Sequence, residues 1–75
     1  SGSVSFDIAD VARSGGYTVK IFSGGEQLFS EYGRAEEGRK TISFGARNIR
    51  PGENKLMIEA IDEAAFYVKD IKVRI

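Results

Sequence analysis

The stretch PGENKLMIEAIDEAAFYVKDI, residues 51–71, decides the fold, because its apolar residues fit both one helix and two strands. At helical spacing, the apolar residues that share one face are Met57, Ile61, Ala64, Val68 and Ile71. At a period of two, the residues that share one face are Leu56, Ile58 and Ala60, followed by Ile71, Val73 and Ile75. The first interpretation gives an α+β domain with a C-terminal helix over a sheet, and the second gives an all-β domain.

The positions of two large apolar residues favour the strands. A helix over residues 53–70 would place Ile58 about 100° from the apolar stripe and Phe66 on the opposite side, so both side chains would face water. Two strands instead gather the apolar residues of each half on one side and give the last strand an antiparallel neighbour. We therefore predict two strands joined by a turn in DEAAF, residues 62–66, although this segment contains neither Gly nor Asn.

The first half of the chain also alternates between apolar and polar residues. Strands with one wet face are predicted at residues 4–8, 17–22 and 41–45. Gly24 and Gly25 predict a two-residue hairpin turn, because both residues tolerate positive φ. This turn sets a register in which the opposite pairs are Ile21 with Leu28, Val19 with Ser30, and Tyr17 with Tyr32. Residues 31–40, rich in charge and containing two Gly, are expected to form an exposed loop or a short edge segment.

Length and composition limit the classes of function. Seventy-five residues make one small domain, and we assign it to residues 4–75, because Ser1, Gly2 and Ser3 resemble a cloning scar. The absence of Cys and His excludes disulfides, the usual zinc sites and His-based catalysis. Eleven basic and eleven acidic residues are interleaved, so we expect no nucleic-acid binding, and no apolar run is long enough for membrane insertion.

A family resemblance appears in IRPGENKLMIEAIDEAA, residues 49–65. This segment resembles a late-strand signature of bacterial immunoglobulin-like domains, in which a PG-x-N turn precedes an alternating strand that ends in A-x-D-x-A-G-N. The matching residues are Pro51, Gly52, Asn54, Leu56, Ile58, Ala60, Asp62 and Ala64. Ala65 and Phe66 stand where Gly and Asn are usual in that pattern. The segment YTVKIFSGGEQLF, residues 17–29, is similar to an earlier hairpin of the same domains.

The resemblance implies an all-β fold, an immunoglobulin-like antiparallel β-sandwich of six or seven short strands. At this length, the chain is expected either to lack an edge strand or to be a compact variant. Alternation along the strands predicts a core made of Val4, Phe6, Ile8, Tyr17, Val19, Ile21, Leu28, Ile42, Phe44, Ile49, Leu56, Ile58, Ala60, Ile71, Val73 and Ile75.

Carboxylates are the first candidates for chemistry, because paired acids hydrolyse glycosides and clustered acids bind calcium. The acids that could converge at one end of a sandwich are Asp7, Asp10, Glu53, Asp62 and Glu63. However, the chain has no D-x-D-x-D-G loop and no phosphate-binding glycine motif. We therefore predict no enzyme activity and no catalytic, cofactor-binding or metal-binding residues.

Apolar and aromatic residues predict a contact surface instead, five of them by their outward parity and Tyr32 as a Tyr able to stack on a sugar ring or anchor a partner. Its members are Phe22, Phe29, Tyr32, Met57, Ile61 and Tyr67. The resemblance implies a non-catalytic structural or protein-interaction module of a bacterial extracellular or cell-surface protein, with a signal peptide upstream of this sequence. Its expected partners are neighbouring domains of the same chain or another protein. The alternative is a carbohydrate-binding or accessory module of a secreted hydrolase, which would bind a glycan through Tyr32 and Tyr67.

Overall fold

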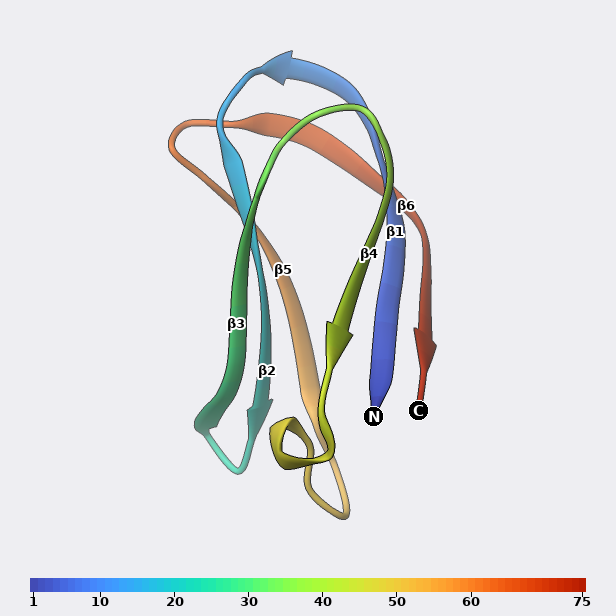
Figure 1. The fold of residues 1–75 in the computed structure, drawn as a ribbon. Coiled ribbons are helices and arrows are strands. Elements are labelled where there is room, and N and C mark those ends of the chain that lie inside the picture. Colours follow the sequence, from blue (N-terminus) through green and yellow to red (C-terminus); the bar gives the residue numbers. More distant parts are fainter.

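A computed structural model describes residues 1–75 as two three-stranded antiparallel sheets that face each other (Figure 1). The strands are β1 (Gly2–Arg13), β2 (Gly16–Ser23), β3 (Glu26–Arg34), β4 (Gly38–Phe44), β5 (Lys55–Ile61) and β6 (Ala65–Arg74), with a short 3-10 helix, η1 (Ala46–Asn48). The strand orders are β4-β1-β6 in one sheet and β3-β2-β5 in the other. The prediction of an all-β domain is confirmed. No helix of this structure has the length and the apolar character needed to cross a membrane.

The stretch that decides the fold forms two strands, β5 and β6, as predicted. The turn between them needs no Gly, because Asp62 and Glu63 themselves adopt φ values of 55° and 64°, and the Ala64 amide donates to the Ile61 carbonyl oxygen over 3.1 Å. Two consecutive residues of positive φ are typical of a type I′ turn. The expectation that β5 and β6 pair with each other is wrong. β5 pairs with β2, while β6 crosses to the other sheet and pairs with β1.

The hairpin of β2 and β3 turns at Gly24 and Gly25, as predicted, but its register differs. A β-bulge inserts Leu28 as an extra residue, because Phe22 pairs with Gln27 while Ile21 pairs with Phe29. Every pair beyond the bulge moves by one residue. The structure therefore corrects the predicted pairs to Val19 with Glu31, Tyr17 with Gly33, and Thr18 with Tyr32. Residues 31–40, expected to form an exposed loop or a short edge segment, belong largely to β3 and β4, which are edge strands.

The core lies between the sheets, and its centre is an edge-to-face contact of Phe6 with Tyr17, whose ring centroids are 5.5 Å apart. The predicted core residues that are buried are Val4, Phe6, Ile8, Tyr17, Val19, Ile21, Ile42 and Phe44. Leu28, Ile49, Leu56 and Ile58 are partly buried. The prediction is wrong for four residues that are exposed, namely Ala60, Ile71, Val73 and Ile75. Buried apolar side chains that it missed are those of Ala35 and Ala64.

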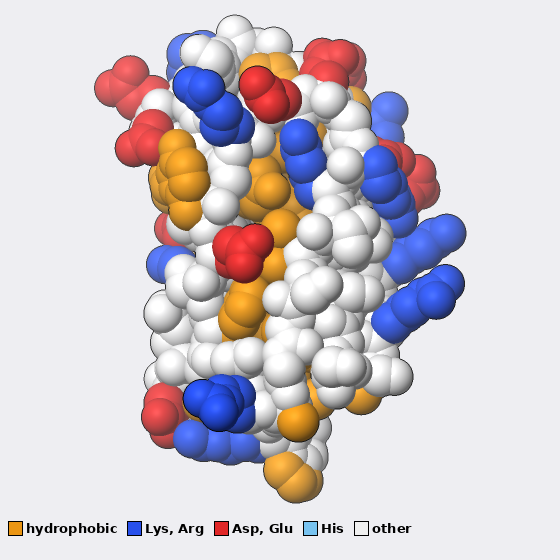
Figure 2. Space-filling model, viewed as in Figure 1, with side chains coloured by type: hydrophobic (Ala, Val, Ile, Leu, Met, Phe, Trp, Pro, Cys, Tyr) orange, Lys and Arg blue, Asp and Glu red, His pale blue; other side chains and the backbone are white.

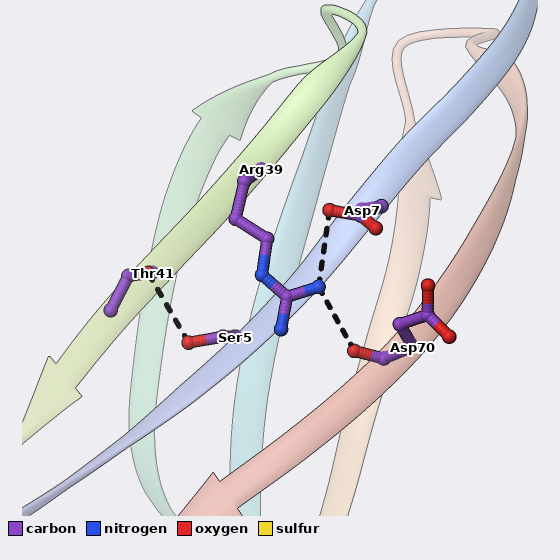
Figure 3. A network of polar contacts seen from close by, with 5 residues as sticks. All are labelled: Ser5, Asp7, Arg39, Thr41 and Asp70. Atoms are coloured by element: carbon purple, nitrogen blue, oxygen red, sulfur yellow. Dashed lines mark hydrogen bonds and ion pairs between the residues drawn. The ribbon is translucent and has the colours of Figure 1, made fainter.

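Strand β6 is interrupted by a bulge at Asp70, which has a φ of 54°. Arg39 on β4 reaches across the sheet to this bulge (Figure 3). Its guanidinium donates to the Asp70 carbonyl oxygen over 3.1 Å and forms an ion pair with Asp7 on β1, also at 3.1 Å. One side chain therefore links all three strands of this sheet. At the other end of the sheet, Gly2 and Ser3 pair with β4, so β1 begins two residues before the predicted domain boundary.

Candidate contact surfaces

The first candidate surface is the outer face of the β3-β2-β5 sheet, where the structure brings together four of the six predicted contact residues. Lys20 pairs with Met57, Phe22 pairs with Lys55, and Gly16 pairs with Ile61. Phe22 and Met57 line a shallow hollow of about 510 Å³ beside the Gly24-Gly25 turn. The hollow is open and has a mixed lining, because Glu53 and Lys55 also contribute to it.

Tyr32 lies at the far end of the same face and packs on Gly16. A Cβ atom at Gly16 would lie 2.6 Å from the Tyr32 ring, so the ring occupies the space that a larger residue at position 16 would fill. Aromatic rings cover strand glycines in this way and reduce the exposure of the backbone. More than half of the Tyr32 side chain is nevertheless exposed. Tyr32 therefore covers the backbone at Gly16, and this structural role accounts for an aromatic residue at an exposed position.

Two predicted contact residues lie elsewhere. Phe29 points into the sandwich, where it packs against the core and makes an edge contact with Phe44 at 6.2 Å between ring centroids. The predicted outward parity of Phe29 is wrong, because the bulge at Leu28 reverses it. Tyr67 pairs with Ala9 on the outer face of the other sheet. Tyr32 and Tyr67 thus lie on opposite faces of the molecule and do not form one platform for a sugar ring.

The carboxylates that could have formed a chemical site do not converge. Glu53 precedes β5 and Asp62 follows it, so these two acids lie at opposite ends of that strand. Asp7 is paired with Arg39, and no cluster of acidic residues has the arrangement of a metal site. The side chain with a clearly shifted pKa is Tyr17, whose pKa is raised by burial and by the nearby Glu31 carboxylate. Tyr17 is a core residue, so this shift concerns stability.

A second surface, which sequence reasoning missed, lies along the free edge of β6. Ile71, Val73 and Ile75 are 52%, 54% and 81% exposed. Val73 and Ile75 line an apolar cleft of about 180 Å³ between the two sheets, which Leu56 of β5 also lines. The alternation of residues 71–75 predicted that these side chains point inward and are buried, but the structure leaves them exposed.

The outer face of the same strand is basic. Lys72 and Arg74 pair with the outward residues Ser5 and Ser3, and Lys69 pairs with Asp7. None of the three cations forms an ion pair, and the Asp7 carboxylate opposite Lys69 is bound by Arg39. In Figure 2, Lys and Arg side chains gather along the side of the molecule where Figure 1 places β6. The fold therefore separates charges that are interleaved in the sequence.

Comparisons with protein-family models, with curated proteins and with solved structures found no match.

Proposed function

We propose that this chain is a non-catalytic, immunoglobulin-like module of a bacterial extracellular or cell-surface protein, and that it contacts a neighbouring domain or another protein. The observation that carries the proposal is the apolar end of β6, where three aliphatic residues at alternate positions are each more than half exposed. Small soluble domains rarely leave a contiguous row of aliphatic side chains in water, and such rows mark contact sites.

The order of the strands supports the immunoglobulin-like part of the proposal. In immunoglobulin domains, strand B lies between A and E in one sheet, and strands C and F are neighbours in the other. β1 and β4 have the places of B and E, and β3, β2 and β5 have those of C′, C and F. β6 differs, because it lies beside β1 in the place of strand A, whereas the last immunoglobulin strand lies beside F. This difference leaves β5 without a neighbour on its outer side, and β6 is an edge strand of the other sheet.

The energetics of the β6 edge support a contact. Burial of an aliphatic side chain contributes about 1.5–3 kcal/mol when it is complete. Ile71, Val73 and Ile75 obtain only part of this within the chain, since each is more than half exposed. A partner that covers all three would therefore gain several kcal/mol from the hydrophobic effect.

Site-specific photo-crosslinking in the source cells tests this proposal. A photoreactive amino acid replaces Val73, and the control variant carries it at Thr41, which is exposed on β4 at the opposite edge of the same sheet. We expect a defined crosslinked protein or domain from position 73 and none from position 41. Equal yields from both positions, or no product from position 73, would refute the proposed contact.

A further inference from the structure

The free edge of β6 has the features of a site for an added strand. β6 has a hydrogen-bonded neighbour only on its β1 side. Between Ile71 and Arg74, the backbone N–H and C=O groups that point away from β1 have no partner within the chain. Unpaired edge groups of this kind are the template on which an extended peptide adds to a sheet.

The side chains of this edge define which strand would fit. On the inner side, Val73 and Ile75 line the apolar cleft between the sheets, and Leu56 lies across from them on β5. Alternate residues of an added strand would enter this cleft, because side chains of neighbouring strands project to the same side at paired positions. The inner positions of the partner strand therefore require apolar residues.

The outer side requires the opposite character. Lys69, Lys72 and Arg74 project outward without ion-pair partners, since the three ion pairs of the chain involve other cations. Asp70 is the one acidic residue of β6, and it lies in the bulge. Opposite charges at cross-strand positions are favourable, and like charges are unfavourable. The outer positions of the partner strand therefore require acidic residues.

A second copy of this chain fits less well through the same edge. Antiparallel pairing of β6 with its own copy, with the apolar residues kept on one face, would place Lys72 opposite Lys72 or Arg74. Like charges directly opposite each other destabilise a strand pair. Charge complementarity thus favours a partner strand of different sequence over a homodimer.

From the free backbone groups, the apolar cleft and the row of cations, we propose that β6 binds an extended peptide segment in which apolar and acidic residues alternate, as an added strand of the β4-β1-β6 sheet. This inference rests on the proposed function and specifies the chemistry of its partner.

A synthetic probe tests the inference directly. The probe is the fluorescently labelled peptide Glu-Val-Glu-Val-Glu-Val-Glu, titrated with the domain by fluorescence anisotropy and followed on the domain by amide NMR. Three control peptides are used: one with Lys in place of Glu, one with the same composition in two blocks, and one N-methylated at alternate residues so that it cannot pair with a strand edge. We expect binding of the first peptide only, with the largest amide shifts between Ile71 and Arg74.

Matched variants separate the site from general electrostatics. Lys72→Glu should weaken binding at least about threefold at low salt, whereas Arg34→Glu makes the same change of charge on β3, in the other sheet, and should leave binding unchanged. A native pattern of amide shifts for each free variant shows that the fold is intact.

Three outcomes would overturn the inference: no binding of the alternating acidic peptide at millimolar concentration, equal binding of the block or N-methylated peptide, or shifts located away from β6. Self-association through β6, detected by sedimentation, would assign the edge to a second copy and would also overturn it. If the peptide fails while the crosslink from position 73 is found, the acidic strand is wrong and the proposed contact stands. If the peptide does not bind and no crosslink forms from position 73, the acidic strand and the proposed function are both wrong.

Discussion

The substitutions Phe29→Ala and Leu28→Ala test the bulge in β3, because the two possible registers predict opposite results. Without the bulge, Leu28 would face Ile21 in the core and Phe29 would face water. With the bulge, Phe29 packs against the core and against Phe44. Leu28 is then partly buried, and its backbone carbonyl accepts a hydrogen bond from the Asn48 side chain that a change to Ala leaves intact.

The expected magnitudes follow from these contacts. Truncation of a fully buried Phe to Ala costs about 3–5 kcal/mol. Phe29 is partly buried, so we expect a loss of about 2 kcal/mol, of which the edge contact with Phe44 accounts for about 0.5–1.5 kcal/mol. Leu28→Ala should cost about 1 kcal/mol or less, because Leu28 is outside the group of residues packed on the core.

Urea unfolding gives both free energies by linear extrapolation, provided that the slope with denaturant is unchanged. In thermal unfolding, the loss for Phe29→Ala corresponds to a fall in Tm of roughly 8–16 °C for a domain of this size. A double-mutant cycle of Phe29→Leu with Phe44→Leu should give a coupling energy that the two single variants do not explain. If Leu28→Ala lowers the free energy of unfolding more than Phe29→Ala does and the cycle shows no coupling, the bulged register is wrong and Phe29 faces solvent.

Four further results are expected. Glu63→Gly should raise the free energy of unfolding by about 1 kcal/mol, because Glu63 has positive φ in the turn before β6; a lower Tm would contradict this conformation. Because burial and Glu31 raise the pKa of Tyr17 above its ordinary value of 10.0, the unfolded state loses this proton first as pH rises. The stability is then fully present below pH 10.0 and falls above it, and urea unfolding at about pH 11 should show a smaller alkaline loss for Tyr17→Phe than for the parent. Arg39→Ala should lower the free energy of unfolding by about 1 kcal/mol, and less at high salt; an equal cost at all salt concentrations would argue against a role of the exposed ion pair. On a glycan array, we expect no sugar binding that depends on Tyr32, and binding lost in Tyr32→Ala would restore the carbohydrate-binding alternative.

The fold class was predictable because the relevant signals are local. A period of two in the apolar residues needs no knowledge of distant strands, and the turn at Gly24 and Gly25 depends on only those two residues. The choice of strands over a helix for residues 51–71 depended on the positions of Ile58 and Phe66. That choice is confirmed, because Phe66 packs against the core from β6.

The register and the pairing of the last strand were not predictable, for two physical reasons. A bulge adds one residue to a strand and thereby exchanges the inner and outer faces beyond it. At Leu28 no Gly marks the bulge, and the Asp70 bulge depends on a non-Gly residue that adopts positive φ. In addition, the choice of β1 as the partner of β6 depends on contacts between the two ends of the chain, and no local pattern reports it.

The prediction that Ile71, Val73 and Ile75 are buried failed for a different reason, and this reason bears on function. An alternating pattern shows which side of a strand is apolar, but it does not show whether the chain has another element to cover that side. Here β6 lies at the edge of its sheet, and the cleft beneath Val73 and Ile75 is lined from both sheets but open to solvent. A strand whose apolar side is filled by its own domain and a strand whose apolar side is filled by a partner therefore have the same sequence pattern. Exposure in the structure shows that the domain itself does not cover the apolar side at the end of β6, and this is the observation on which the proposed contact depends.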